Sequence, residues 1–267
     1  MTAAALRALH HGRAADDPLV LPGPWDAESA RIFAAAGFPA LATPSAGVSA
    51  ALGYADGGTP PDEMFAAVAR IVRAVDVPVT ADLEAGYGLP AKELVERIAA
   101  TGAVGCNIED SDHHSGALTD AGRQADRLAA IRAAAGDGLV LNARIDVFLP
   151  GRGGSGGVDG SGGTGGSGGT DDSGGAGLAA QVEEAVRRGL RYADAGADCV
   201  YPILAPPRVL RELADRIGLP VNAIAVPGGP SPRELGAAGA SRVTFGGGLH
   251  RRAMGAVQAL AEELRTG

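Results

Sequence analysis

The sequence predicts an α/β protein whose eight strands close into a (β/α)8 barrel of the TIM type. Three observations lead to this prediction: short β-rich runs alternate with Ala-rich amphipathic segments, eight such units can be counted, and polar residues gather where the strands end. Strict alternation favours a parallel sheet with covered faces, and eight units favour a closed barrel over an open sheet. We expect one domain over residues 1–267, an ordinary length for such a barrel.

The eight predicted strands are short runs rich in apolar and β-branched residues. The first of them, "LVLPG", is the weakest. The remaining seven, such as "PVTADLE" and "LVLNARID", are clearer. In chain order the runs are 19–23, 39–45, 78–84, 104–110, 139–146, 198–204, 220–226 and 242–248.

The segments between the strands carry the start and stop signals of helices. "DAESARIFAAAG" begins with Asp26 as a cap and closes on Gly37. "TPPDEMFAAVARIVRAV" opens with Thr59, a Pro at the first helical position and Asp62, which is a capping-box pattern. Several other segments end at Gly, as helix C-termini often do.

Composition excludes several classes of function. The net charge is −8 and no basic stripe is visible, so we expect no nucleic-acid partner. No apolar run reaches the roughly 18 residues of a membrane helix, and the N-terminus lacks a signal-peptide core. We therefore expect a soluble, cytoplasmic protein that does not bind membranes. Cys106 and Cys199 lie in apolar runs and are expected to be buried free thiols.

Polar residues lie at the ends of the predicted strands, where barrels of this kind gather their chemistry. Residues two apart share one face of a strand. Asp82 therefore shares a face with Glu84, and Asn107 shares one with Glu109. The same pattern continues with Asn142, Arg144 and Asp146 on the fifth strand, Asn222 on the seventh, and Asp56 after the second. If these faces point inward, four carboxylates converge around one cavity.

Converging carboxylates repel one another unless something compensates their charge. A hard divalent cation is the usual solution, because carboxylate and water oxygens suit Mg²⁺ or Mn²⁺. Arg144 would add a permanent, bidentate positive charge for a carboxylate, phosphate or enolate oxygen. A second interpretation stays open, in which Asp82, Glu109 and Arg144 form an inert buried ion network. Asp146 is expected to cap the turn after its strand.

Residues 151–177 are rich in Gly and Ser and follow the fifth strand. This composition cannot bury enough apolar surface to offset the entropy of ordering, so we expect a flexible insertion within the domain. The segment matches neither a P-loop nor a nucleotide fingerprint. It is interpreted either as a neutral insertion or as a lid over the mouth of the barrel.

Five stretches in the same order resemble the phosphoenolpyruvate mutase/isocitrate lyase superfamily. They are "GFPALATPSAGVSAALGYADG", "VPVTADLEAGYG", "GCNIEDS", "LNARIDVF" and "PVNAIAVPGG…ELGAAGASRVTFGGGLHRRAM". The resemblance implies a Mg²⁺-dependent barrel enzyme that makes or breaks C–C or P–C bonds beside a 2-oxo or 2-hydroxy acid. It also implies a homo-oligomer, a dimer or a tetramer, with exchange of C-terminal helices between neighbouring barrels.

The resemblance also assigns roles to residues of this chain. The metal ligands would be Asp56, Asp82, Glu84 and Glu109, with Mg²⁺ preferred and Mn²⁺ acceptable. The catalytic residues would be Arg144 and Glu109. The substrate would be bound by Thr43, Ser45, Ala46 and Gly47 of the loop 43–47, by Asp82 and Arg144, and at its distal end by Asn222 and Arg252.

Two departures from the family pattern narrow the expected reaction. The loop "EDSDHHSGALTD" lacks the Cys of the lyases and the Lys of the phosphonate-forming mutases, although His113 or His114 could act there. Ile203 stands where tricarboxylate lyases carry a Glu. We therefore expect a Mg²⁺-dependent lyase that cleaves a C–C bond beside a small carboxylate through a pyruvate-like enolate. The alternatives are a phosphonopyruvate mutase or hydrolase, and an inactive barrel that binds 2-oxo acids.

Overall fold

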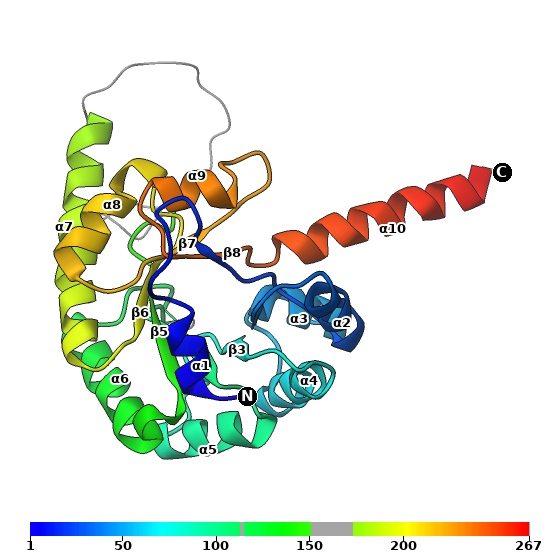
Figure 1. Cartoon of the computed structure of the whole chain (residues 1–267), viewed down its shortest axis with the longest axis horizontal. Helices are drawn as coiled ribbons and strands as arrows, with labels where there is room; N and C mark the ends of the chain where they lie inside the picture. The colour runs from blue at the N-terminus through cyan, green and yellow to red at the C-terminus, as the bar shows by residue number, and fades with distance from the viewer. Residues whose placement is uncertain (113–114, 151–172, 267) are drawn as a thin grey trace.

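All eight predicted strands are present in the computed structural model, which describes residues 1–112, 115–150 and 173–266 (Figure 1). Each strand is shorter than its predicted run. The strands are β1 Leu19–Val20, β2 Leu41–Thr43, β3 Val79–Asp82, β4 Gly105–Glu109, β5 Val140–Ile145, β6 Cys199–Pro202, β7 Asn222–Ile224 and β8 Arg242–Thr244. His113, His114 and residues 151–172 of the predicted insertion lie outside the described residues, and residues 173–177 begin a helix.

The strands form a closed parallel barrel. Strands β2 to β6 pair in chain order, and β1, β8 and β7 form a second parallel set. A bridge between Val200 and Val221 joins β6 to β7. On the other side the Ala42 N–H donates to the Pro22 carbonyl at 3.1 Å, which joins β2 to the end of β1. The predicted (β/α)8 barrel is therefore confirmed.

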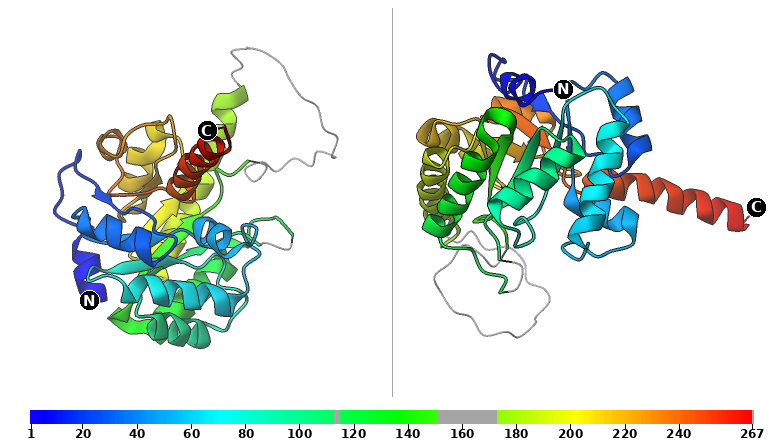
Figure 2. Two further views of the ribbon diagram at one scale, coloured as in Figure 1. Left: turned by 90° about the vertical axis from the view of Figure 1, so that its right-hand side faces the viewer. Right: turned by 90° about the horizontal axis from the view of Figure 1, so that it is seen from below.

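The helices lie around the outside of the strands (Figures 1 and 2). From α4 to α8 each helix contacts the next, which covers the outer face of β3 to β6. The helices are α1 Ala3–Ala8, α2 Ala27–Ala35, α3 Ser45–Leu52, α4 Pro61–Arg73, α5 Ala91–Thr101, α6 Ala121–Ala135, α7 Ser173–Asp194, α8 Pro207–Ile217, α9 Pro232–Ala237 and α10 Gly248–Thr266, with a short 3₁₀ turn η1 Gly136–Gly138.

One of the two predicted capping patterns is confirmed and the other is wrong. Asp26 caps α2 by accepting the Ser29 N–H at 2.7 Å, and the Ser29 hydroxyl completes a capping box. At α4 the cap position is Pro60, which makes no side-chain cap bond. Thr59 therefore lies one residue too early to cap the helix. Its hydroxyl instead donates to the Ser49 hydroxyl at 2.7 Å and ties α4 to α3.

Apolar residues fill the space between the barrel and its helices, and α1 covers one end of the barrel. Leu6 of α1 is fully buried in a cluster with Leu19 and Val140 at the N-terminal ends of the strands. Cys106 and Cys199 are buried free thiols, as expected, and burial raises the pKa of each to about 12. These thiols are therefore protonated at neutral pH.

Helix α10 projects away from the barrel, with the C-terminus at its far end (Figures 1 and 2). Its start contacts α3. Further along, an apolar stripe runs along one side of the helix and is exposed: Met254 at 41%, Val257 at 55%, Leu260 at 54% and Leu264 at 78%. Among the described residues no helix is long and apolar enough to cross a membrane.

Candidate functional site

The parallel register brings the predicted polar residues to one end of the barrel. Asp82 of β3 lies opposite Asn107 of β4, which lies opposite Asn142 of β5. Two residues further on, Glu109 lies opposite Arg144. The Asn142 amide donates to the Asn107 side-chain oxygen at 2.7 Å, so both asparagines are used inside the barrel. Alternation along each strand and register between strands together place these groups at the C-terminal mouth.

Asp82 is held by the segment that the sequence identified as a substrate loop. Residues 45–47 of that segment form the first residues of α3, and Pro44 stands at the cap position. The Ser45 hydroxyl donates to Asp82 Oδ2 at 2.8 Å and the Ser45 N–H donates to the same atom at 3.3 Å. The Asp82 N–H donates to the Thr43 hydroxyl at 3.3 Å. The other carboxylate oxygen, Asp82 Oδ1, is buried and has no hydrogen-bond partner among the described residues.

Arg144 lies between two carboxylates at the same mouth. Its Nε is 2.6 Å from Asp146 Oδ1, and its Nη2 donates to Asp146 Oδ2 at 3.1 Å. Its Nη1 forms an ion pair with Glu109. Burial alone would lower the pKa of this guanidinium, but Asp146, Glu109 and Asp82 raise it above its ordinary value. Arg144 is thus a permanent cation at the centre of the acids.

The expectation that Asp146 caps a turn is wrong. Its side chain is fully buried and binds Arg144 on one side and the Ser111 hydroxyl on the other. Its N–H donates to Asp110 Oδ1 at 2.9 Å. The reason is the alternation that also places Arg144: Asp146 continues the inward face of β5, so its carboxylate meets the guanidinium instead of the backbone after the strand.

The remaining predicted residues are more dispersed. Asn222 is fully buried and donates to the Thr244 hydroxyl at 3.1 Å. Arg252 is exposed on α10, and Asp56 is exposed between α3 and α4. Ala46 and Gly47 follow Ser45 in the first turn of α3. No contact within the described part of the chain brings Asn222 or Arg252 to Arg144.

The four predicted metal ligands all act electrostatically on the phenol of Tyr87. Burial raises the pKa of Tyr87, and Glu84, Asp82, Glu109 and Asp56 raise it further. The Tyr87 hydroxyl is buried without a hydrogen-bond partner among the described residues. Over the same residues, no three Asp, Glu, His or Cys side chains are close enough to hold a metal ion. The donors nevertheless suit a hard cation, because they are carboxylate oxygens and Asp82 Oδ1 is buried without a partner.

Sequence reasoning named Glu84 as a metal ligand but missed the strained backbone of the turn after β3 and the arginine beside it. Glu84 and Tyr87 have φ values of 52° and 56°, in the left-handed region. With Glu109 and Arg127 they line a pocket of about 880 Å³ beside the mouth. The Gly-Tyr-Gly sequence signals a turn of this kind, but nothing in the sequence points to Arg127.

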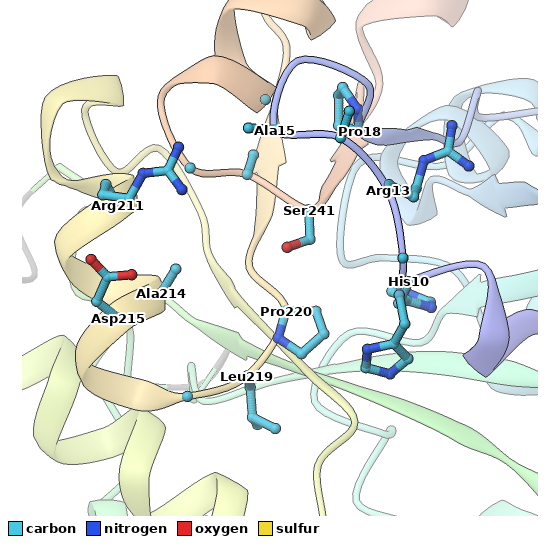
Figure 3. A pocket seen from close by; sticks show the side chains of 17 residues that line it. His10, Arg13, Ala15, Pro18, Arg211, Ala214, Asp215, Leu219, Pro220 and Ser241 are labelled. Carbon is cyan, nitrogen blue, oxygen red and sulfur yellow. The ribbon is translucent and has the colours of Figure 1, made fainter.

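A second pocket, of about 620 Å³, lies at the opposite end of the barrel (Figure 3). His10, Arg211, Asp215, Pro220 and Ser241 are among its lining residues. Pro220 and Ser241 precede β7 and β8, so this pocket is at the N-terminal ends of the strands. It contains none of the predicted site residues, and in barrels of this kind that end contributes to stability rather than chemistry.

Comparisons with known proteins agree with this geometry. The model of the phosphoenolpyruvate phosphomutase family matches residues 6–265. An uncharacterized protein of Mycobacterium tuberculosis H37Rv is 31% identical over 89% of this chain and 80% of its own length. A provisionally named phosphonomutase from Burkholderia cenocepacia J2315 is 36% identical, with a TM-score of 0.80 over 98% of this chain and 97% of that one.

One further solved structure is that of 2,3-dimethylmalate lyase. It is 27% identical, with a TM-score of 0.79 over all of this chain and 88% of that one. The family match spans almost the entire barrel, and the similar structures include a lyase and a provisional mutase. The chain therefore belongs to the phosphoenolpyruvate mutase/isocitrate lyase superfamily, a superfamily of lyases and mutases.

Proposed function

We propose that this protein is a Mg²⁺-dependent lyase that cleaves a C–C bond next to a 2-oxo or 2-hydroxy carboxylate. The observation that carries the proposal is the arrangement at the mouth. Asp82 keeps one buried carboxylate oxygen without a partner, while Arg144 lies nearby as a permanent cation. Superfamily members are typically dependent on a divalent metal, and 2,3-dimethylmalate lyase shares this fold.

Asp82 and Glu109, with Asp56 and Glu84, would hold the metal, and Mn²⁺ would be an acceptable substitute. When bound, the metal supplies Lewis-acid stabilisation of negative charge on the substrate. Arg144 binds the carboxylate or the developing enolate oxygen through its guanidinium donors. The Ser45 N–H and hydroxyl orient Asp82 from the start of α3, so that this carboxylate needs no reorganisation during the reaction.

The cleavage of an oxaloacetate-type substrate draws electrons toward its own 2-oxo group. Such a reaction needs no acid on the loop after β4, where this chain lacks the Cys of the lyases. A second candidate is a phosphonopyruvate mutase or hydrolase acting on a P–C bond. It is favoured by the 36% identity to the provisionally named phosphonomutase.

The test is an Asp82→Asn variant assayed with a panel of 2-oxo and 2-hydroxy acids. Asn can still accept from Ser45, so the free energy of unfolding should change by no more than about 1 kcal/mol. Release of pyruvate or glyoxylate should fall at least about 100-fold, and the response to added Mg²⁺ should disappear.

Asp126→Asn is the matched control, because Asp126 is exposed on α6 away from the mouth. It should retain full activity. Undiminished, Mg²⁺-dependent turnover by Asp82→Asn would refute the lyase proposal. A new phosphorus NMR signal from phosphonopyruvate would favour the second candidate. Tight oxalate binding without turnover of any acid would identify an inactive binding barrel.

We also propose that α10 is exchanged between neighbouring barrels in a dimer or tetramer. The supporting observation is the exposed stripe of Met254, Val257, Leu260 and Leu264 on a helix that projects from its own barrel. Such a stripe needs a partner to be buried. A Leu260→Glu variant should sediment as a smaller species than the unchanged chain. If the unchanged chain and the variant both sediment at the mass of a single chain, the exchange is contradicted.

A further inference from the structure

The turn after β3 holds a strained backbone beside the acids. Within the described ranges, Glu84, Tyr87 and Leu204 are the only non-glycine residues with positive φ, and two of them are in this turn. Such a backbone conformation is strained for a residue other than glycine and persists only where its surroundings fix it. Gly86, with φ 81°, lies between them. Something outside the turn must therefore hold this conformation.

Arg127 of α6 is the group that contacts the turn from outside. Its Nη2 donates to the Gly86 carbonyl at 3.4 Å and to the Leu89 carbonyl at 3.3 Å. The guanidinium is so close to Gly86 that a Cβ there would lie 2.5 Å from Nη2. Gly86 is therefore required both by its φ and by the approach of Arg127. The two carbonyls bracket Tyr87, so the guanidinium spans the strained part of the turn.

Arg127 does not have the partners of an arginine kept for stability. In the described part of the chain no acid pairs with it, and its Nε is buried without a partner. Burial alone accounts for its lowered pKa, with no acid to raise it. Two long hydrogen bonds to carbonyls contribute little stability compared with the cost of partly removing a guanidinium from water. The position of Arg127 is better explained by the side chains of Glu84 and Tyr87, which the turn holds.

The turn carries two groups that face the mouth. Glu84 is buried and its carboxylate acts on Tyr87, as do Asp82 and Glu109. Glu84, Tyr87 and Arg127 all line the pocket of about 880 Å³. A shift of the Gly86 and Leu89 carbonyls would therefore move both the carboxylate and the phenol relative to Asp82.

We propose that Arg127 is a positioning residue that clamps the turn 84–89 and thereby fixes the Glu84 carboxylate and the Tyr87 phenol beside Asp82. It acts through the backbone of the turn and does not touch the reacting atoms. Its effect on turnover rests on the proposed lyase function, whereas the clamp itself does not.

The test combines hydrogen exchange with kinetics in an Arg127→Met variant of the full chain. The amides of Gly86 and Leu89 are bonded within the turn to the carbonyls of Leu83 and Gly86. Peptides covering 83–90 should exchange at least about tenfold faster in the variant, while peptides from α4 and β4 stay unchanged. The value of kcat should fall about 100-fold with a smaller change in KM, because misplacement of catalytic groups affects the transition state most.

Three further variants keep the proposal falsifiable. Arg123→Met removes an exposed arginine one helical turn earlier on α6 and should leave exchange of the turn unchanged. Arg127→Lys should restore part of the protection and part of kcat. Gly86→Ala should also exchange faster, because the added Cβ meets Arg127 and the residue has a positive φ, so this variant supports the clamp without deciding it.

The outcomes separate the two proposals. Unchanged exchange of 83–90 in Arg127→Met would overturn the clamp, whatever the activity and whatever the exchange of Gly86→Ala. Faster exchange with no turnover of any acid by the unchanged chain would sustain the clamp and refute the lyase proposal. If Arg127→Met fails to fold, Arg127→Lys decides the question by the same exchange measurement, and exchange as slow as in the unchanged chain together with an unchanged kcat would then overturn the clamp.

Discussion

The two ends of the barrel each hold a half-buried carboxylate, but the hydrogen bonding of the two differs. At the N-terminal end, Asp198 precedes β6 and has both oxygens paired. Oδ1 accepts from Arg7 at 2.6 Å, and Oδ2 accepts from Arg132 at 2.5 Å and from the Leu141 N–H at 2.8 Å. At the C-terminal end, Asp82 has Ser45 on one oxygen and no described partner on the other.

This difference distinguishes the charges that stabilise the fold from those that we propose take part in the chemistry. Asp198 joins α1, α6 and β5, so its network fastens the base of the barrel. At the mouth, the Arg144 guanidinium forms ion pairs with both Glu109 and Asp146. A folded chain seldom leaves buried polar atoms unsatisfied unless a ligand or strained site uses them. The comparison thus supports the proposed site at the mouth without reference to any relative.

The largest expected effect comes from removing the central cation, in an Arg144→Met variant. Glu109 and Asp146 would then be buried without their counter-charge, which should lower the free energy of unfolding by about 3–5 kcal/mol. Turnover should fall by about 10² to 10³, because the oxyanion loses its main donor. Urea unfolding and the lyase assay measure the two quantities on the same preparation.

The matched change at the other end is Asp198→Asn. It should cost about 1–3 kcal/mol, since charge-assisted hydrogen bonds to Arg7 and Arg132 are weakened. The activity of the folded fraction should be unchanged. A loss of turnover equal to that of Arg144→Met would show that the two ends are not functionally distinct.

Spacing within single strands was sufficient to predict the part of the site that depends on strand geometry. Asp82, Glu109 and Arg144 follow from alternation and from the expectation that parallel strands end together. Asp146 shares the inward face of Arg144, but it was misinterpreted because spacing did not show that this pair would form or that Ser111, 35 residues away at the end of another strand, would bind its other side. Sequence patterns give the face of a residue but not its partner across the barrel.

Arg127 and Arg252 show a different limit. Arg127 lies on a helix that carries several arginines, and nothing in the local sequence sets it apart from them. Only its hydrogen bonds to carbonyls 38 and 41 residues earlier distinguish it. Arg252 was assigned to the distal end of the substrate, yet it is exposed on a helix that leaves the barrel. The position of that helix relative to a site depends on assembly, which local propensity does not encode.

The smallest expected effect is a change in the pH dependence of stability, caused by one titratable group at the N-terminal end. His10 is 6% exposed, and its Nδ1 is 2.9 Å from the Leu6 carbonyl. Since a carbonyl only accepts, Nδ1 carries the proton and Nε2 is the bare nitrogen, which has no partner within the described residues. Burial lowers the pKa of His10 from 6.5 to about 4, and Arg242 and His11 lower it while the Leu6 carbonyl and Asp198 oppose them.

The sign of the pH dependence follows from that lowered pKa. Between pH 6.5 and 4 the unfolded chain binds a proton at His10 that the folded chain does not bind, so stability falls as the pH falls. From pH 7 to pH 5 this group should account for about 2 kcal/mol of lost stability. In His10→Asn, whose amide can still donate to the Leu6 carbonyl, that part of the loss should vanish in urea unfolding at the two pH values. Because His10 lies far from Asp82 along the barrel axis, the pH profile of turnover should be the same in both proteins. A profile displaced by the substitution would mean that charge at the base reaches the mouth, and the separation of the two ends would then fail.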